Sequence, residues 1–567
     1  MAEKNECVVK VPLFTWFAGY HRSWLRGDMI AGVTVWAVLV PEALAYAQIA
    51  GVSPVVGLYA APGALILYAA FGSSRHLVTG PMAATAALSA AAVGELAAGG
   101  SDAFVQLTIT LALVVGILAL AAGVLRLGFL ASFISEPVLK GFVIGLALTI
   151  MVGQLPKLFG IEKSEGAFFQ QLWGLLGDLG DTSGPTLVVG VLSLLLVVGL
   201  KRYLPVVPGA LVAVLLGILA VNLFDLDGHG VAIVGHIESG LPSFGLPDVA
   251  AHSYLDLSAL AVGVMLIGFA EGLGAAKTYA AKNHYEIDAN RELIGLGAAN
   301  LASGLSSGMV VNGSLSKTAV NGSAGARSQF SSLVVAALAV VTLLFLTGLF
   351  EDLPEATLAA IVVAALIELV DIEALIHLYR FHTRGAGRAY ALAARPDFAA
   401  AGAALLGVLV FDTVPGLFIG IAVSLLLLLY RASRPHIAVL GRDSAASGRW
   451  SDIQRDPVNE RVPGVVVLRP ESGLFFANAD AVRDAIRAHA AVKGTKAVVL
   501  DAETVPSIDV TAVSMLVELA GDLRRDGIEL VLARDVAAVR GLVQLGEGDT
   551  PLRTYPTVRA AIAALEK

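Results

Sequence analysis

The chain has 567 residues, of which 56% are hydrophobic and only 15% are charged, whereas soluble proteins carry about 25% charged residues. Its 38 Lys and Arg residues are outnumbered by 46 Asp and Glu residues, which gives a net charge of −8 and no basic surface for a nucleic acid. The single cysteine, Cys7, excludes an internal disulfide and a Cys-rich zinc site. The composition therefore indicates a membrane protein that does not bind nucleic acid.

The chain begins with residues 1–26, which carry several cationic side chains and lack the apolar core of a cleaved signal peptide. Apolar segments follow in two sets, and some, such as residues 329–350, run uncharged for long enough to cross a bilayer. We expect seven plus seven membrane spans, the first set within residues 27–225 and the second within 255–432. The spans are predicted at residues 29–47, 54–71, 81–98, 105–124, 136–155, 184–200 and 206–224, and then at 256–276, 291–307, 314–326, 329–350, 353–370, 396–412 and 414–430.

The distribution of Lys and Arg predicts the orientation of these spans. If the N-terminus is cytoplasmic, the loops on the opposite side contain only Lys157 and Lys163, and residues 225–256 between the two sets contain neither Lys nor Arg. The cytoplasmic loops then contain Arg75, Arg126, Lys140, Lys201, Arg202, Lys277, Lys282, Arg291, Arg327, Arg380, Arg384, Arg388 and Arg395. Because cytoplasmic loops carry the excess of positive charge, we expect both termini in the cytoplasm and the protein in the inner (plasma) membrane.

An odd number of crossings in each set gives the two halves opposite orientations, which is the layout of an inverted-repeat transporter. In each half the third span is short and opens with a helix-breaking turn, at residues 79–81 (Thr-Gly-Pro) and at residues 312–314 (Asn-Gly-Ser). Interrupted segments at corresponding positions of two halves point to a transporter's substrate site. We therefore expect these two half-helices to meet where the substrate binds.

After the last span, residues 441–567 become rich in charge, and their apolar residues fall into short runs. Residues 464–468 and 496–500 have the pattern of buried strands, and residues 480–491 and 510–526 have that of amphipathic helices. The sequence therefore predicts a cytoplasmic α/β domain at the C-terminal end.

Two carboxylates, Glu42 and Glu271, lie inside otherwise apolar spans. A charged carboxylate at the bilayer centre costs about 2.5 to 3.5 kcal/mol, so such groups usually face a cavity, pair with another group or take up a proton. A structural role, in which each is hydrogen-bonded to a neighbouring helix, is the alternative. We favour a functional role for both.

Residues 312–318 (Asn-Gly-Ser-Leu-Ser-Lys-Thr) open a helix with free N–H groups, two hydroxyls and a cation within one turn. Free amides and the positive end of the helix dipole attract an oxyanion, although Ser314 alone would also fit an ordinary helix cap. Residues 80–85 provide the corresponding helix start in the first half. Residues 316–318 lack the glycine of a phosphate-binding P-loop, and no metal-ligand spacing or nucleophile with its base occurs. We predict an anion site and neither an enzyme nor a cofactor.

With these features in place, the chain resembles the SulP family of sulfate permeases and related anion transporters over nearly its whole length. Four segments carry the resemblance, and the last of them contains the Gly-Ser-Leu-Ser-Lys-Thr-Ala-Val-Asn pattern of plant sulfate transporters. They are residues 41–47 (Pro-Glu-Ala-Leu-Ala-Tyr-Ala), 57–59 (Gly-Leu-Tyr), 71–75 (Phe-Gly-Ser-Ser-Arg) and 271–321. The C-terminal domain resembles a STAS domain through residues 474–479 and 501–521.

The resemblance implies a core that carries the substrate, a gate against which the core moves like an elevator, and a homodimer that the STAS domain helps to form. It also implies which residues hold the anion and which couple a cation. The implied set is Ser314, Leu315 and Ser316 at the second helix start, Met82 and Ala83 at the first, Glu42 and Tyr46 on the first span, Lys317 offsetting the anion's charge, and Glu271 in cation coupling.

Two positions depart from the family's pattern. Glu42 stands where many relatives have glutamine, and residues 509–512 (Asp-Val-Thr-Ala) replace the Asp-Ser-Ser-Gly of phosphorylated bacterial STAS proteins. Thr511 retains a hydroxyl that could accept phosphate, but capping of the following helix explains this residue adequately. We expect the structural role for Thr511.

Electrical work limits the mechanism, because moving a divalent anion against 100 mV costs about 4.6 kcal/mol. One coupled proton halves that cost and two remove it. We expect a proton-coupled sulfate symporter in which Glu271 carries the main proton and Glu42, protonated with it, makes import electroneutral. A sodium-coupled bicarbonate importer is the nearest alternative, since an acidic residue in the eighth span can also bind sodium. An anion channel and a STAS domain acting as a signalling module are further alternatives.

Overall fold

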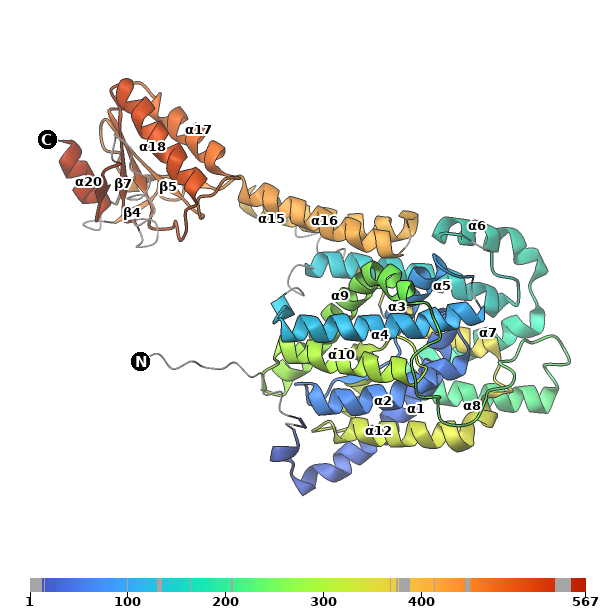
Figure 1. Ribbon diagram of the computed structural model, residues 1–567. Coiled ribbons are helices and arrows are strands. Elements are labelled where there is room, and N and C mark those ends of the chain that lie inside the picture. The colour runs from blue at the N-terminus through green and yellow to red at the C-terminus, as the bar shows by residue number, and fades with distance from the viewer. Residues whose placement is uncertain are drawn as a thin grey trace. The chain divides into compact units, whose positions relative to one another are not determined.

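The structure is a computed structural model that divides into two compact units, Met1–Ser424 and Leu425–Lys567. Figure 1 shows that the first unit is built of helices and that the second combines helices with a sheet. Cys7 and part of the predicted N-terminal segment 1–26 lie outside the described residues. The structure describes residues 13–566 except 15, 99, 130–134, 165, 205–206, 368, 374–375, 377–387, 412, 444–448 and 536–551.

The helices of the first unit follow the two predicted sets. In the first set they are α1 (Leu25–Ile49), α2 (Pro54–Phe71), α3 (Ala83–Gly94), α4 (Asp102–Val124), α5 (Glu136–Phe159), α6 (Phe168–Gly177), α7 (Gly184–Tyr203) and α8 (Gly209–Phe224). In the second set they are α9 (Ala251–Lys282), α10 (Ala289–Leu305), α11 (Leu315–Ser323), α12 (Phe330–Val341), α13 (Glu355–Ile367), α15 (Arg388–Phe411) and α16 (Thr413–Ala432), the last of which continues past Ser424 into the second unit. Each predicted span coincides with one of these helices, and α6 lies between two of them.

The lengths of the helices separate the spans into two kinds. Among the described residues, eight helices are both long and apolar enough to cross a membrane. By contrast, α3 has 12 residues and α11 has 9, whereas a helical crossing needs about 20. Each of these two short helices follows a strand, so each reaches only part of the way across and completes its span with extended chain.

The two strands pair with each other and join the halves of the unit. β1 (Val78–Gly80) and β2 (Asn312–Ser314) are antiparallel, with Thr79 opposite Gly313. A Cβ at Gly313 would come within 2.7 Å of a Leu77 side-chain carbon and 3.0 Å of the Gly272 Cα, so only glycine permits this approach. The ribbon brings the starts of α3 and α11 together from opposite directions.

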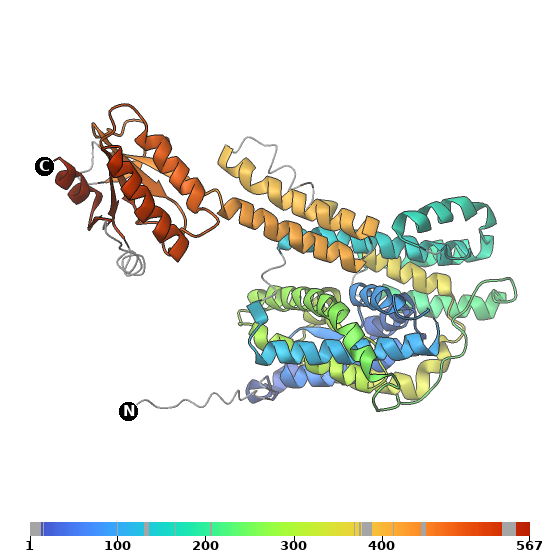
Figure 2. The same ribbon diagram turned by 45° about the horizontal axis from the view of Figure 1, so that its top comes forward.

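Packing divides the helices of this unit into two modules. The core module comprises α1–α4 and α9–α12, in which α10 packs between α2 and α4 (Figures 1 and 2), and the gate module comprises α5, α7, α8, α13 and α15. Contacts between the modules are few and join α1 to α8 and α13, and α3 to α5. The half-helices and the ribbon therefore belong to the core module, and α3 lies at its border with the gate module.

Two fully buried carboxylates anchor the core module. Glu292, in the first turn of α10, accepts hydrogen bonds from the Tyr68 hydroxyl (2.6 Å) and from the backbone and hydroxyl of Ser73 (2.8 and 2.7 Å). Asp28 on α1 accepts a 2.7 Å hydrogen bond from the Ser328 hydroxyl between α11 and α12. A buried carboxylate requires such partners. Glu292 therefore holds the segment after α2 against α10, and Asp28 holds the segment after α11 against α1.

The second unit contains a six-stranded sheet with the strand order β4-β3-β5-β6-β7-β8. Strands β5, β6, β7 and β8 are parallel to one another. Strand β3 is antiparallel to both of its neighbours, β4 and β5. The strands are β3 (Ile437–Arg442), β4 (Trp450–Asp452), β5 (Val465–Pro470), β6 (Ala497–Asp501), β7 (Glu529–Ala533) and β8 (Thr554–Tyr555), and the helices are α17 (Ala479–Ala490), α18 (Val510–Arg525) and α20 (Val558–Leu565).

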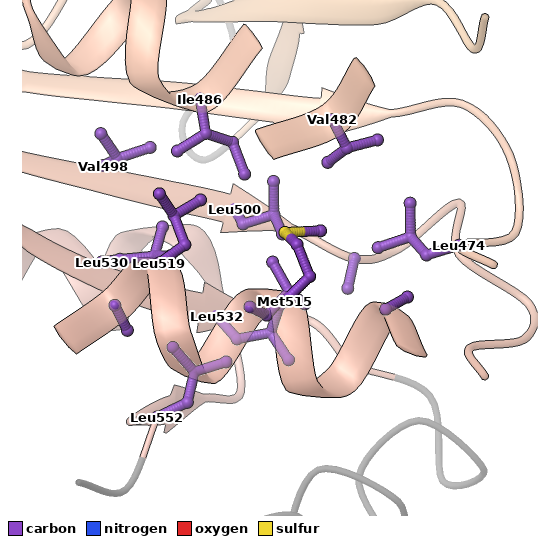
Figure 3. Packing of buried hydrophobic residues seen from close by; sticks show 14 of the residues in the cluster. Leu474, Val482, Ile486, Val498, Leu500, Met515, Leu519, Leu530, Leu532 and Leu552 are labelled. Carbon is purple, nitrogen blue, oxygen red and sulfur yellow. The ribbon is translucent and has the colours of Figure 1, made fainter. Parts of the chain in front are cut away.

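The core of this domain lies between the sheet and the helices α17 and α18. Leu500 of β6, Ile486 of α17 and Leu519 of α18 meet there (Figure 3), and all three are buried. The other face of the sheet buries Val499 against α20. Parallel strands covered on both faces are near-continuously apolar, which is why the strand and helix predictions match the structure closely.

The start of the domain differs from the predicted boundary at Gly441, because β3 begins at Ile437. Gly441 interrupts the apolar pattern of this strand, and glycine inside a strand marks a close approach of another part of the chain. A Cβ at this position would lie 2.8 Å from the Asn459 Cβ.

Candidate anion-binding site

The strands β1 and β2, which precede α3 and α11, pair antiparallel with Gly80 opposite Asn312, so the two helices start at opposite ends of one short ribbon. Each helix start leaves N–H groups without partners inside the helix, and the dipole makes this end positive. The antiparallel pairing therefore points two positive helix ends toward the ribbon from opposite sides. Two such ends facing one region are suited to an anion.

The start of α11 combines a capped amide with exposed groups. The Ser314 hydroxyl accepts a 3.2 Å hydrogen bond from the Lys317 N–H and lies 3.1 Å from the Ser316 hydroxyl. Ser314 is therefore the helix cap that the sequence also allowed. Leu315 and Ser316 are exposed, and among the described residues no acceptor is recorded for their N–H groups. These two amides and the Ser316 hydroxyl are the donors that an anion can reach.

The start of α3 offers backbone groups without polar side chains. Met82 is the N-cap residue, and its side chain makes no capping hydrogen bond. Ala83 and Ala84 follow, so the first amides of this helix belong to residues with small side chains. Thr85 turns its hydroxyl back to the Met82 carbonyl at 3.3 Å. The two helix starts are thus equivalent in position but different in chemistry.

A buried ion pair lies beside the second helix start. The Lys317 Nζ lies 2.7 Å from a Glu42 carboxylate oxygen, donates a 3.0 Å hydrogen bond to the Pro81 carbonyl and lies 5.1 Å from the centre of the Tyr46 ring. The Lys317 side chain is 1% exposed. Lys317 therefore links α11 to α1 and to the residue before the α3 start, and Glu42 already balances its charge.

Glu42 is buried on α1 and ion-paired, whereas Glu271 is half-buried on α9 and forms no ion pair with any described residue. One of its carboxylate oxygens is buried and has no hydrogen-bond partner among the described residues. On the same helix, Gly268 and Gly272 admit the Asn312 side chain, because Cβ atoms there would lie 3.3 and 3.0 Å from its atoms. Glu271 thus lies between two positions that contact β2, on a helix that packs against α3 and α11.

A cavity of about 10 Å³ adjoins this region and is large enough for one water molecule. Thr85, Asn300 and Asn312 supply its polar lining, and Gly268 of α9 also borders it. The buried Asn312 Nδ2 has no hydrogen-bond partner within the described part of the chain. A water in this cavity would satisfy that amide.

The structure brings together some of the residues predicted for the site and leaves others apart. Lys317, Glu42 and Tyr46 form one cluster, and Ser314 and Ser316 form a second at the adjoining helix start. For Glu271, no contact with either cluster is recorded among the described residues. The pairing of Lys317 with Glu42 was not predicted, since sequence reasoning assigned Lys317 to the anion and Glu42 to a proton.

Thr511 lies in the second unit, and the role expected for it there is wrong. The cap of α18 is Asp509, whose carboxylate accepts a 2.8 Å hydrogen bond from the Ala512 N–H. Thr511 is an exposed residue inside the first turn. Aspartate and threonine are both common caps. The cap Asp509 directly follows Ile508, which bridges to Leu474, and lies two residues before the threonine.

Sequence reasoning missed Asn312, Thr318 and Asn321 as residues that shape the site. Thr318 accepts a 3.1 Å hydrogen bond from the Val78 N–H, and Asn321 donates a 2.9 Å bond to the His76 carbonyl. Together they hold β1 against α11. Their signal was the polarity of this segment at membrane depth, where Thr318 and Asn321 are three residues apart and share a face of α11, and Asn312 lies in β2.

A helical unit with two opposed half-helices, followed by a sheet domain, defines a membrane transporter built of two inverted halves. Residues 25–391 match the Sulfate permease family, and residues 456–561 match the STAS domain. The chain therefore belongs to the sulfate permease family, as its motifs indicated, and it is a transporter rather than an enzyme.

Several relatives share most of their length with the chain. A protein of Mycobacterium tuberculosis (strain CDC 1551 / Oshkosh) named probable sulfate transporter MT1781 is 39% identical over 552 residues, which are 95% of this chain and 96% of the relative. Sulfate transporter 4.1, chloroplastic, of Arabidopsis thaliana is 33% identical over 563 residues, covering 94% of this chain and 80% of the relative.

Solved structures confirm the predicted fold. The murine solute carrier 26 family member A9 anion transporter in the inward-facing state matches with a TM-score of 0.88 at 21% identity, covering 97% of this chain and 93% of the other. The transmembrane domain of the cyanobacterial bicarbonate transporter BicA matches with a TM-score of 0.59 at 25% identity, covering 70% of this chain and 98% of the other. The prediction of a polytopic helical unit followed by a STAS domain is thus confirmed.

Proposed function

We propose that the protein is a secondary active transporter that imports sulfate together with protons and moves its core module against its gate module. The observation that carries this proposal is the β1–β2 ribbon, which brings two half-helix starts together. The names of the relatives from Mycobacterium and Arabidopsis support sulfate as the anion.

In this proposal the anion lies between the two helix starts. The amides of Leu315 and Ser316 and the Ser316 hydroxyl donate from one side, and the amides near Ala83 donate from the other. Met82 and Tyr46 border the same space. Oriented amides cost little reorganisation when an anion arrives, because the helix holds them in place before binding.

The coupling proton is assigned to Glu271. A carboxylate oxygen that is buried without a hydrogen-bond partner in the described structure favours binding of a cation, because isolated negative charge is costly at membrane depth. Glu42 shares the intramembrane setting, but its 2.7 Å ion pair with Lys317 already compensates its charge. We therefore assign one proton to each sulfate, which halves the electrical cost of import.

The arrangement of the modules supports an elevator movement. The half-helices belong to the core module, and the few contacts between core and gate run along α1 with α8 and α13, and along α3 with α5. We further propose that the protein is a homodimer in the inner membrane with both termini in the cytoplasm. The distribution of Lys and Arg in the loops supports this orientation.

Uptake of radiolabelled sulfate into proteoliposomes tests the proposal. An inward proton gradient should drive uptake in the unmodified protein, and an inward sodium gradient alone should not. Glu271→Gln should lose the response to protons, whereas Glu95→Gln, which changes an exposed carboxylate at the end of α3, should retain it. Proton-independent uptake in both variants would contradict the coupling.

A sodium-coupled bicarbonate importer is the second candidate, because the membrane unit also resembles that of the bicarbonate transporter BicA. The same liposomes decide between the two. If a sodium gradient drives bicarbonate uptake and sulfate is not taken up under either gradient, the second candidate replaces the first.

A further inference from the structure

The end of α5 that carries Lys157 joins the gate module to the core module. The Lys157 Nζ lies 3.1 Å from a carboxylate oxygen of Glu355, the first residue of α13. It also donates a 3.0 Å hydrogen bond to the side-chain oxygen of Gln48, near the end of α1. Because α5 and α13 belong to the gate module and α1 belongs to the core module, Lys157 lies at the seam between them.

Lys163 approaches the same face of α5. A Cβ at Gly153 would lie 3.7 Å from the Lys163 Nζ and 3.4 Å from the Gln171 side-chain oxygen. Gly153 and Lys157 are four residues apart and therefore share one helix face. Although the Lys163 side chain is exposed, desolvation of its ammonium by neighbouring atoms, followed by the positive charge of Lys157, lowers its pKa below the ordinary value. The two ammonium groups are thus close enough to repel each other.

The repulsion is not compensated at Lys163. Lys157 has Glu355 as its counterion, but no described residue forms an ion pair or a hydrogen bond with the Lys163 ammonium. Two ammonium groups have six N–H donors, and the contacts with Gln48 and Glu355 use two of these. Lys163 is exposed, so its ammonium donors face solvent and can bind an arriving anion.

We propose that Lys157 and Lys163 form an outer docking site for a small oxyanion, at the seam between α1, α5 and α13. The anion would pause there before it reaches the half-helix starts. This inference rests on the proposed function for the identity of the anion and for the outward orientation of the α5 end.

The charge of the surrounding loops explains why such a site is needed. On the proposed outer side, the loop sequences contain many carboxylates, and Lys157 and Lys163 are their only Lys or Arg residues. Glu162, which is exposed and adjacent to Lys163, is among these carboxylates. An acidic surface lowers the local concentration of an anion, whereas a local positive site raises it.

Sulfate uptake at low ionic strength tests the docking site. Lys163→Gln should raise the KM for sulfate about three- to tenfold with little change in the maximal rate, since electrostatic capture acts on encounter. Glu162→Gln should lower the KM, and both effects should shrink as salt screens the charges. Lys140→Gln, at the other end of α5 and paired there with Glu136, is the control. Equal KM values for Lys163→Gln and Lys140→Gln would overturn the inference.

A labelling experiment separates this inference from the proposed function. In the full-length Cys7→Ser protein, Lys163→Cys should react with an anionic thiol reagent faster than with a cationic one of similar size. External sulfate should slow the labelling at constant ionic strength, and gluconate should not. If sulfate gives no protection, the docking site is wrong even when uptake occurs. If sulfate protects but uptake is absent, the proposed function fails and the docking site stands.

Discussion

The starts of α3 and α11 occupy equivalent positions in the two halves, yet they differ in the groups that they present. At α11, Ser314 caps the helix, Ser316 adds a hydroxyl, and Lys317 holds an ion pair with Glu42. At α3, Met82 makes no capping hydrogen bond and the following residues are alanines. One start therefore acts through side chains and backbone together, and the other through backbone alone.

This difference shows what the repeated architecture requires and what it leaves free. The pairing of β1 with β2 requires only that both chains approach closely, and the N–H groups at a helix start do not depend on the side chain. The chemistry of the side chains can then be concentrated in one half. Substitutions at α11 should change charge and hydrogen bonding, whereas substitutions at α3 should act through size.

Removal of Lys317 should have the largest effect at the α11 start. Lys317→Met leaves the Glu42 carboxylate buried without its 2.7 Å partner, and breaking a buried ion pair costs about 3 to 5 kcal/mol. We expect a lower melting temperature and no sulfate uptake, measured by thermal unfolding in detergent and by liposome flux.

The double variant Glu42→Gln with Lys317→Met provides the control for that experiment. Its melting temperature should recover, because no isolated charge remains, whereas uptake should stay low if the link from Lys317 to the Pro81 carbonyl positions the two helix starts. Recovery of uptake in the double variant would show that Lys317 serves only to balance Glu42.

A larger side chain at Ala83 should have the next largest effect. Ala83 is 6% exposed at a start where only backbone amides face the proposed anion, so Ala83→Leu should occupy that space. We expect the KM for sulfate to rise at least about tenfold, which corresponds to about 1.4 kcal/mol. Ala83→Ser is the matched control, because it adds a donor with little volume and should transport normally. Equal transport by both variants would place the anion elsewhere.

Glu42→Gln tests whether this carboxylate carries a proton or only balances Lys317. The sequence alone suggested that the substitution makes an electroneutral cycle electrogenic, but the ion pair leads us to expect the same proton-to-sulfate ratio in both proteins. The voltage at which net flux vanishes, measured at several pH gradients, reports that ratio. A shift that corresponds to one proton fewer per sulfate would restore the proton-carrying role.

Ser316 and Ser314 should separate binding from helix stability at the α11 start. Ser316→Ala removes an exposed donor and should weaken sulfate binding by about 1.5 kcal/mol, as expected for a hydrogen bond to a charged group, without lowering the melting temperature. Ser314→Ala removes the cap bonded to the Lys317 N–H and should cost about 1 kcal/mol of stability. The interpretation fails if the two variants show the reverse pattern.

The sequence predicted the elements of this fold more completely than the contacts within its site. Apolar runs and turn residues revealed the spans, the two short helices and the strands of the STAS domain, because hydrophobic periodicity and helix-breaking residues act locally. The ion pair of Lys317 with Glu42 joins residues far apart in the chain, and no local pattern encodes such a pairing. The Asn312 side chain was missed for the same reason, since its place depends on Gly268 and Gly272 of another helix.

The capped start of α18 is a reference for the two helix starts in the membrane unit, and the Thr511 substitution there should give the smallest effect. Asp509 accepts the Ala512 N–H at 2.8 Å, so Asp509→Ala should lower the stability of the STAS domain by about 0.5 to 2 kcal/mol. Thr511→Ala should change that stability by less than about 0.5 kcal/mol, as for most exposed positions. Unfolding of the second unit, followed in the full-length protein, would measure both. A large loss with Thr511→Ala would mean that its hydroxyl stabilises the helix start, whereas no loss would leave this hydroxyl without a structural role.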